Sequence, residues 1–199
     1  EYYTLIQAAD FIYTLSHIPG FKPLQKGKEL GRWIKQTERY YDASTYCQLS
    51  IATALSDYYN TNKKWKKAKY WIDIQKKLSE QCKNFIQLGN AYVVEASVAT
   101  SKKDKVLLHN VINGILSEKR IPQQFATTAL NQCLLFGYEQ LGKKEIESIY
   151  TIIASKDSLD LQQLLCAADK AAQWKFSGDK HKFLQVCTER IFHQLYPLV

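Results

Sequence analysis

The sequence contains no methionine and few of the residues that break regular structure. Only 8 glycines and 4 prolines occur in 199 residues. All-β folds need many tight turns built from such residues, so their scarcity argues against an all-β fold and favours long helices with short breaks. Because the chain lacks an initial methionine and opens within an apolar pattern, EYYTLIQAADFIYTL, we expect it to be a piece of a longer protein.

Long apolar runs and clustered cysteines are also missing. No apolar run is long enough to cross a bilayer, and no charged-then-apolar leader with a cleavage site is visible. The 5 cysteines are widely separated and form no C-x-x-C pair. Most lie beside leucine, alanine or valine, as free cysteines do when they act as small buried residues in a reducing compartment. The sequence therefore predicts a cytoplasmic protein without disulfides or a bound metal.

Motifs for catalysis and for phosphate binding are absent as well. The 4 histidines form no H-E-x-x-H pair, and no G-x-G-x-x-G, G-x-x-x-x-G-K-[ST] or G-x-S-x-G motif occurs. Carboxylates such as Glu145 and Glu147 flank lysines, as ordinary surface residues of a helix do. We therefore predict a protein that is not an enzyme and that needs no cofactor.

What the sequence does contain is helical periodicity along nearly its whole length. Hydrophobic residues make up 46% and charged residues 23%, which is typical of a folded soluble chain. Apolar residues recur at spacings of three and four, as from Phe125 to Ala129 and Cys133, and strand-like alternation is absent. The run YVVEASVAT at Tyr92 has no flanking turns, so we predict that it forms the middle of a buried helix.

Lysine-bearing breaks divide these helices into pairs. The successive separations from Lys63 to Lys103, Gly142 and Gly178 are about 40, 39 and 36 residues, within the range of helical-pair repeats. The predicted fold is all-α, with about ten helices stacked as antiparallel hairpins in one domain, residues 1–199. An irregular helical bundle is the alternative. The predicted hairpins are Tyr2–Tyr40, Thr45–Leu78, Gln81–Lys119, Pro122–Ala154 and Leu159–Leu195.

One segment, ATALSDYYNTNKKWKKAKYWIDI, resembles a tetratricopeptide repeat. Leu55, Ser56 and Tyr59 stand where that family places the Leu, Gly and Tyr of its first helix. Trp65, Ala68 and Ile72 stand at the matching positions of its second helix. The segments LLFGYEQLGKKEIESIY and AAQWKFSGDKHKFLQVC match at fewer positions. The resemblance implies a tetratricopeptide-like α-solenoid, whose first helices line a concave groove that holds a peptide or a partner helix.

Most groove positions carried over from this resemblance are small or hydrogen-bonding side chains. Such side chains suit the capture of a peptide backbone, although solvated faces of amphipathic helices have the same composition. The expected groove residues are Thr53, Asp57, Asn60, Asn90, Ser97, Gln132, Phe136, Glu139 and Lys175. The resemblance thus implies a non-enzymatic scaffold or adaptor domain with a protein or peptide partner.

The net charge of +8 suggests an alternative function, binding to an anionic partner. If the hairpins stack in register, lysines at the breaks would form a basic rim that could bind nucleic acid or an anionic surface. The rim residues are Lys63, Lys64, Lys102, Lys103, Lys143 and Lys144. We favour a solvated edge, because arginine, which contacts phosphate bidentately, is scarce there.

A third interpretation is packing inside a larger complex through apolar residues at the chain ends, such as Tyr2 and Tyr196.

Overall fold

The computed structural model describes residues 45–154, 164–165, 168–169, 172 and 180–196. This part contains seven α-helices and one 3-10 turn, and no strand. The elements are α3 (Thr45–Thr61), α4 (Trp65–Gln81), α5 (Phe85–Lys102), α6 (Lys105–Ser117), α7 (Gln123–Gly137), η2 (Tyr138–Gln140), α8 (Lys143–Ala154) and α10 (Lys180–Leu195). Contacts group the chain into two compact units, Glu1–Val98 and Ala99–Val199, with the boundary inside α5.

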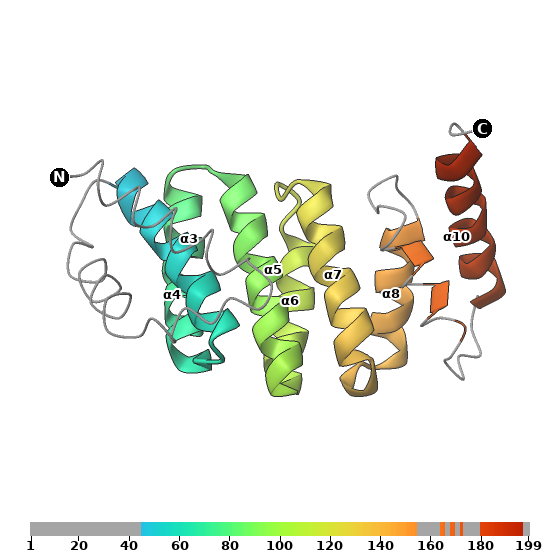
Figure 1. Ribbon diagram of the computed structural model, residues 1–199, viewed down its shortest axis with the longest axis horizontal. Helices are drawn as coiled ribbons and strands as arrows, with labels where there is room; N and C mark the ends of the chain where they lie inside the picture. The colour runs from blue at the N-terminus through green and yellow to red at the C-terminus, as the bar shows by residue number, and fades with distance from the viewer. Residues whose placement is uncertain (1–44, 155–163, 166–167, 170–171, 173–179, 197–199) are drawn as a thin grey trace. The chain divides into compact units, whose positions relative to one another are not determined.

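The all-α prediction is confirmed for these residues, and helices that are neighbours in the chain pack antiparallel (Figure 1). The described helices begin and end within a few residues of three predicted hairpins, those starting at Thr45, Gln81 and Pro122. The predicted hairpin Tyr2–Tyr40 lies outside the described residues, and the first helix and the turn of Leu159–Leu195 lie largely outside them. The count is therefore seven helices in the described part, where the sequence analysis expected about ten for the whole chain.

In the first unit, α3 is buried on all sides along its middle. Every residue from Ile51 to Tyr59 is at most 9% exposed, because small or apolar side chains surround the helix instead of forming one stripe. By contrast, α4 is amphipathic and packs against α3. Its buried residues recur at spacings of three and four, and they are Ala68, Trp71, Ile72, Gln75, Leu78 and Ser79.

Three turns share one backbone geometry. Lys63, Lys83 and Lys103 follow α3, α4 and α5, and their φ angles are 56°, 53° and 53°. The amide of each lysine donates to the carbonyl three residues earlier, and the next amide donates five residues back, as from Lys64 to Tyr59 at 2.8 Å. This is a Schellman motif, in which a left-handed residue lets the last carbonyls of a helix find donors. These lysines therefore stand at the residue that ends each helix.

We expect glycine at these three positions to stabilise the fold, because a residue with a Cβ is strained at positive φ and glycine is not. Each of Lys63→Gly, Lys83→Gly and Lys103→Gly should raise the free energy of unfolding by about 0.5–1 kcal/mol, measured by urea denaturation. The control is Lys77→Gly, in the exposed interior of α4, which should lower it by about 1 kcal/mol. Lower stability in all three turn variants would contradict the left-handed geometry.

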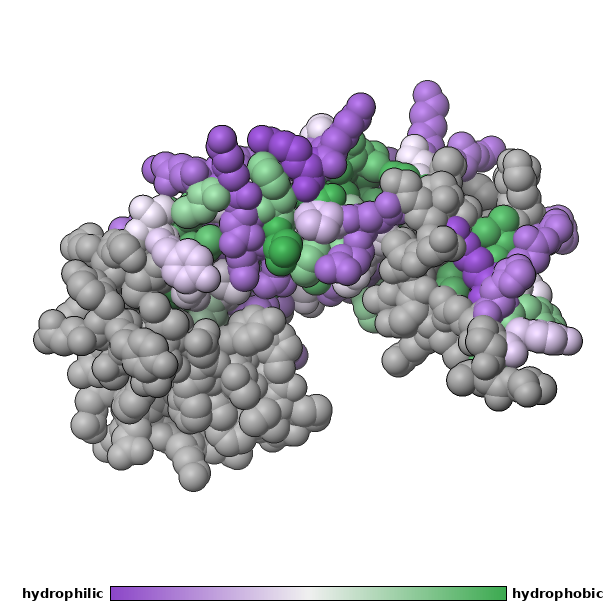
Figure 2. Space-filling view, turned by 90° about the horizontal axis from the view of Figure 1, so that it is seen from above, coloured by the Kyte–Doolittle hydropathy of each residue, from purple (hydrophilic) through white to green (hydrophobic). Residues whose placement is uncertain are grey.

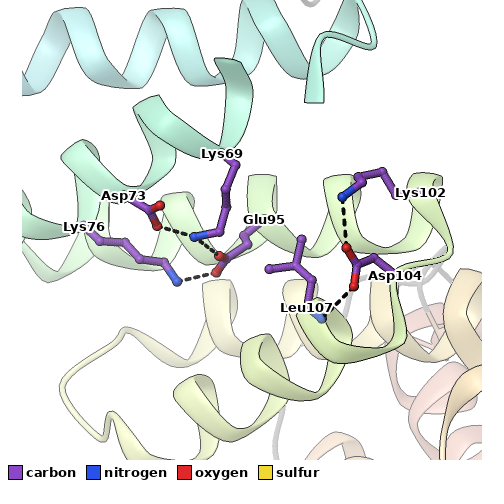
Figure 3. Close-up of polar contacts among 7 residues, drawn as sticks. All are labelled: Lys69, Asp73, Lys76, Glu95, Lys102, Asp104 and Leu107. Carbon is purple, nitrogen blue, oxygen red and sulfur yellow. Dashed lines mark hydrogen bonds and ion pairs between the residues drawn. The ribbon is translucent and has the colours of Figure 1, made fainter. Parts of the chain in front are cut away.

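In the second unit, α6, α7 and α8 pack in chain order, and α8 also contacts α10. The first turn of α6 is capped by Asp104, whose carboxylate accepts the Leu107 amide at 3.1 Å. The same carboxylate pairs with Lys102 at 2.9 Å (Figure 3). Hydrogen bonds from Lys102 and from the Leu107 amide lower the pKa of Asp104, so this cap stays ionised to a lower pH than an ordinary aspartate.

The start of α8 is tied to α6. Glu145 accepts the Gly142 amide at 2.9 Å, which is half of a capping box. Its other carboxylate oxygen bonds Nδ1 of His109 on α6. The expectation that Glu145 is an ordinary surface residue is therefore wrong. Helix packing brings His109, 36 residues earlier in the chain, beside it.

Candidate functional site

The groove residues predicted on α3 lie within packed structure. Thr53 and Asp57 are 8% and 9% exposed. Thr53 Oγ1 donates to Gln87 Oε1 on α5 at 3.1 Å, and Asn60 Nδ2 donates to Ser97 Oγ at 3.0 Å. In this structure these side chains join α3 to α5, so they contribute to the contact between helices.

Buried amides fix these helices further. Ser56 Oγ donates to Gln75 Oε1 at 2.9 Å, and Gln75 Nε2 donates to the Gln87 carbonyl at 3.2 Å. Gln75 is fully buried, so losing either partner would leave a polar group without water to replace it. The network thus holds α5 in a fixed orientation against α3 and α4, and with it the outer face of α5.

One face of α5 stays open to solvent. Asn90, Val93 and Ser97 are half-buried on it, and Ile86 at its start is 56% exposed. Spacings of three and four place them on one side of the helix. Asn90 and Ser97 are predicted groove residues. We call Ile86, Asn90, Val93 and Ser97 the α5 strip.

A similar face occurs on α7 in the second unit. Phe136 is 67% exposed and lies one turn after Gln132, which lies one turn after Thr128. Both polar side chains are half-buried. We call Thr128, Gln132 and Phe136 the α7 strip. Of the other predicted groove residues, Glu139 is exposed in η2, and Lys175 lies outside the described residues.

Each strip places an amide one turn from an exposed large apolar side chain. Asn90 stands four residues after Ile86, and Gln132 stands four residues before Phe136. The space-filling view also shows apolar side chains at the described surface between projecting hydrophilic ones (Figure 2). Such a pair can insert an apolar group into a partner while the amide bonds its backbone, which is the chemistry of a protein-binding surface.

The predicted lysine rim is partly neutralised. Lys102 pairs with Asp104 at 2.9 Å, and Lys143 lies 3.9 Å from Glu147. The remaining rim residues are exposed and form no ion pair with any residue in the described ranges, and they are Lys63, Lys64, Lys103 and Lys144.

An ion-pair cluster between α4 and α5 was not predicted from the sequence. Glu95 is 4% exposed, and its oxygens contact Nζ of Lys69 at 3.1 Å and Nζ of Lys76 (Figure 3). Lys76 Nζ also lies 3.4 Å from the centroid of the Tyr92 ring, and Lys69 contacts Asp73. The signal in the sequence was a single carboxylate inside the apolar run YVVEASVAT, because a buried charge needs partners.

Burial affects the two lysines of this cluster differently. The side chain of Lys76 is 19% exposed and that of Lys69 is 38% exposed. Burial lowers the pKa of Lys76 more than the charge of Glu95 raises it. Burial also acts to lower the pKa of Lys69, but hydrogen bonds and charges from Asp73 and Glu95 outweigh it and raise that pKa. The charged form of Lys76 therefore depends more on the carboxylate of Glu95 than the charged form of Lys69 does.

Within the described residues, no group of three or more His, Cys, Asp or Glu side chains is placed to hold a metal ion. The helices of this part include none with the length and apolarity that a bilayer crossing requires. Among its cysteines, Cys133 and Cys187 are buried and Cys82 is exposed. Comparison of the chain with family models, curated proteins and solved structures finds no match.

Proposed function

We propose that this chain is a helical-repeat module that binds protein or peptide partners through two separate surfaces, the α5 strip of its first unit and the α7 strip of its second, and that it catalyses no reaction. Stacking of its hairpins as a tetratricopeptide-like solenoid is part of the proposal. Two regularities support it. The Schellman turn recurs at residues 63, 83 and 103. The bonds between α3 and α5 join residues 34 and 37 apart, the spacing of equivalent helices in successive repeats.

Of the six residues that carry the tetratricopeptide resemblance, Trp65 is half-buried and the other five are buried. Those on α3 are Leu55, Ser56 and Tyr59, those on α4 are Ala68 and Ile72, and none is more than 2% exposed. Small side chains such as Ser56 and Ala68 allow two helices to approach closely.

The observation that carries the binding proposal is that the exposed ring of Phe136 lies one helical turn from the amide of Gln132. Phe136 is 67% exposed although its neighbours on α7, Cys133 and Leu134, are fully buried. A large aromatic side chain on a helix fixed by a buried core loses little conformational entropy on binding, and aromatic residues dominate binding hot spots. The amide of Gln132 can both donate to and accept from a partner backbone.

The proposal is tested with peptides selected on the immobilised chain from a random peptide library. The dissociation constants of the selected peptides are then measured by calorimetry for the wild type and for variants. For peptides that bind the α7 strip, Phe136→Ala should weaken binding by about tenfold or more and Gln132→Ala by about three- to tenfold. For peptides that bind the α5 strip, Asn90→Ala should weaken binding by about three- to tenfold.

The control is Val106→Ala on α6, which truncates another exposed apolar residue, 71% exposed, outside both strips. It should leave the affinity unchanged. If peptides bind the Phe136→Ala and Asn90→Ala variants as tightly as the wild type, the strips are solvated helix faces and the proposal is wrong.

A further inference from the structure

Lysines are concentrated around α4, and the fold neutralises only some of them. Between residues 63 and 84 the chain has the lysines Lys63, Lys64, Lys66, Lys67, Lys69, Lys76, Lys77 and Lys83, against the acids Asp73 and Glu80. Lys69 and Lys76 are held by Glu95, and Lys67 donates to the Tyr59 hydroxyl at 3.2 Å. The exposed lysines without an ion pair in the described part include Lys63, Lys64, Lys66 and Lys77.

Three of these lysines stand at the unfavourable end of α4. The N-terminus of a helix carries partial positive charge, which attracts anions and repels cations. Lys63, Lys64 and Lys66 surround the N-terminus of α4, its first turn has no acidic residue, and the N-cap Lys64 makes no side-chain capping bond. In contrast, Asp104 caps α6. Positive charge that a fold leaves uncompensated at a helix N-terminus suits an anionic ligand.

An exposed aromatic ring lies on the same face. Tyr70 is 60% exposed and is the exposed large apolar side chain on α4. Its ring makes an edge contact with the buried Trp71, with centroids 5.3 Å apart and an interplanar angle of 82°. Lys66 and Lys77 stand four residues before and seven residues after Tyr70, so the three share one side of the helix. Asp73 lies on the same side between Tyr70 and Lys77, and its carboxylate pairs with Lys69. We call Lys63, Lys64, Lys66, Tyr70 and Lys77 the α4 basic face.

We propose that the α4 basic face binds single-stranded nucleic acid, with phosphates on its lysines and a base stacked on Tyr70. Lysine rows attract the phosphate backbone without reading sequence, and an aromatic platform stacks any unpaired base. One exposed ring offers too little apolar area to insert into a bilayer. The face shares no residue with the α5 strip or the α7 strip, so this proposal does not depend on peptide binding.

The test measures binding of the full chain to a fluorescently labelled thymidine homopolymer by anisotropy over a range of salt concentrations. With four phosphate contacts, the logarithm of the association constant should fall against that of the salt concentration with a slope of about −3. Tyr70→Ala should weaken binding to the single strand by about tenfold, and weaken binding to a duplex far less. The double variant Lys66→Ala/Lys77→Ala loses two phosphate contacts, so its slope should be shallower than that of the wild type by about 1.4.

The matched control is Lys105→Ala with Lys119→Ala, two exposed lysines of the second unit whose removal changes the net charge equally. This variant should bind within about twofold of the wild type. An equal loss in the control would show attraction by net charge alone and overturn the site. An unchanged affinity of Tyr70→Ala for the single strand would overturn the stacking. Binding to phosphatidylserine vesicles without binding to the oligonucleotide would instead assign the face to a membrane surface and overturn the proposal.

Discussion

Replacing Glu95 by glutamine is expected to lower the free energy of unfolding by about 3 kcal/mol. The substitution keeps the shape of the side chain but removes the charge that Lys69 and Lys76 face. The ammonium group of Lys76 then stays largely buried with no carboxylate, and an unpaired buried charge is costly. Lys69 is more exposed and keeps its contact with Asp73, which limits the loss. Urea denaturation followed by far-UV circular dichroism measures the effect.

Two further variants identify the source of this loss. Asp73→Asn removes a carboxylate whose side chain is 57% exposed, and it should cost less than about 0.5 kcal/mol, as exposed ion pairs do. Adding Lys76→Met to Glu95→Gln should recover much of the stability, because no buried cation remains. If Glu95→Gln costs no more than Asp73→Asn, the cluster has only the strength of a surface ion pair.

The positions of the helix pairs could be predicted from the sequence, because the apolar spacing and the lysine breaks are local signals. The turns at Lys63 and Lys103 stand where breaks were expected. The turn at Lys83 was not singled out, although its geometry is the same, because a single lysine stands there between Cys82 and Asn84, without the lysine pair that marks the other two breaks. Lysine is not a residue that favours positive φ, so the left-handed geometry itself could not be predicted.

The exposure of the proposed binding residues could be predicted less well than the helices. Helical spacing indicates which residues share a face, and it places Asn90 and Ser97, both half-buried, on one side of α5. It does not indicate what covers that face, so Thr53 and Asp57 were expected to line a groove and are buried. The contacts of Glu95 depend on residues 19 and 26 positions earlier, on another helix. Such pairings follow from packing, which one helix's pattern does not encode.

Replacing Gly137 by valine is expected to lower the free energy of unfolding by about 2–3 kcal/mol, by overpacking the second unit. A Cβ at this position would lie 2.7 Å from Cδ2 of Leu108 and 3.4 Å from Cγ2 of Thr100. Leu108 is fully buried on α6, so its side chain has no open space into which it can rotate. The end of α7 must therefore shift away from α6, and thermal or urea unfolding measures the cost.

A double-mutant cycle separates this clash from other effects of the substitution. Leu108→Ala alone should cost about 3 kcal/mol through the cavity it leaves. Combined with Gly137→Val, it should cost at least about 1 kcal/mol less than the sum, because the new methyl groups enter that cavity. The control is Gly142→Val, where a Cβ would meet only Glu145 Oε2 at 3.5 Å, and it should cost less than about 1 kcal/mol. Additive costs for Gly137→Val and Leu108→Ala would mean that these two residues do not meet, and that α7 does not approach α6 as closely as described.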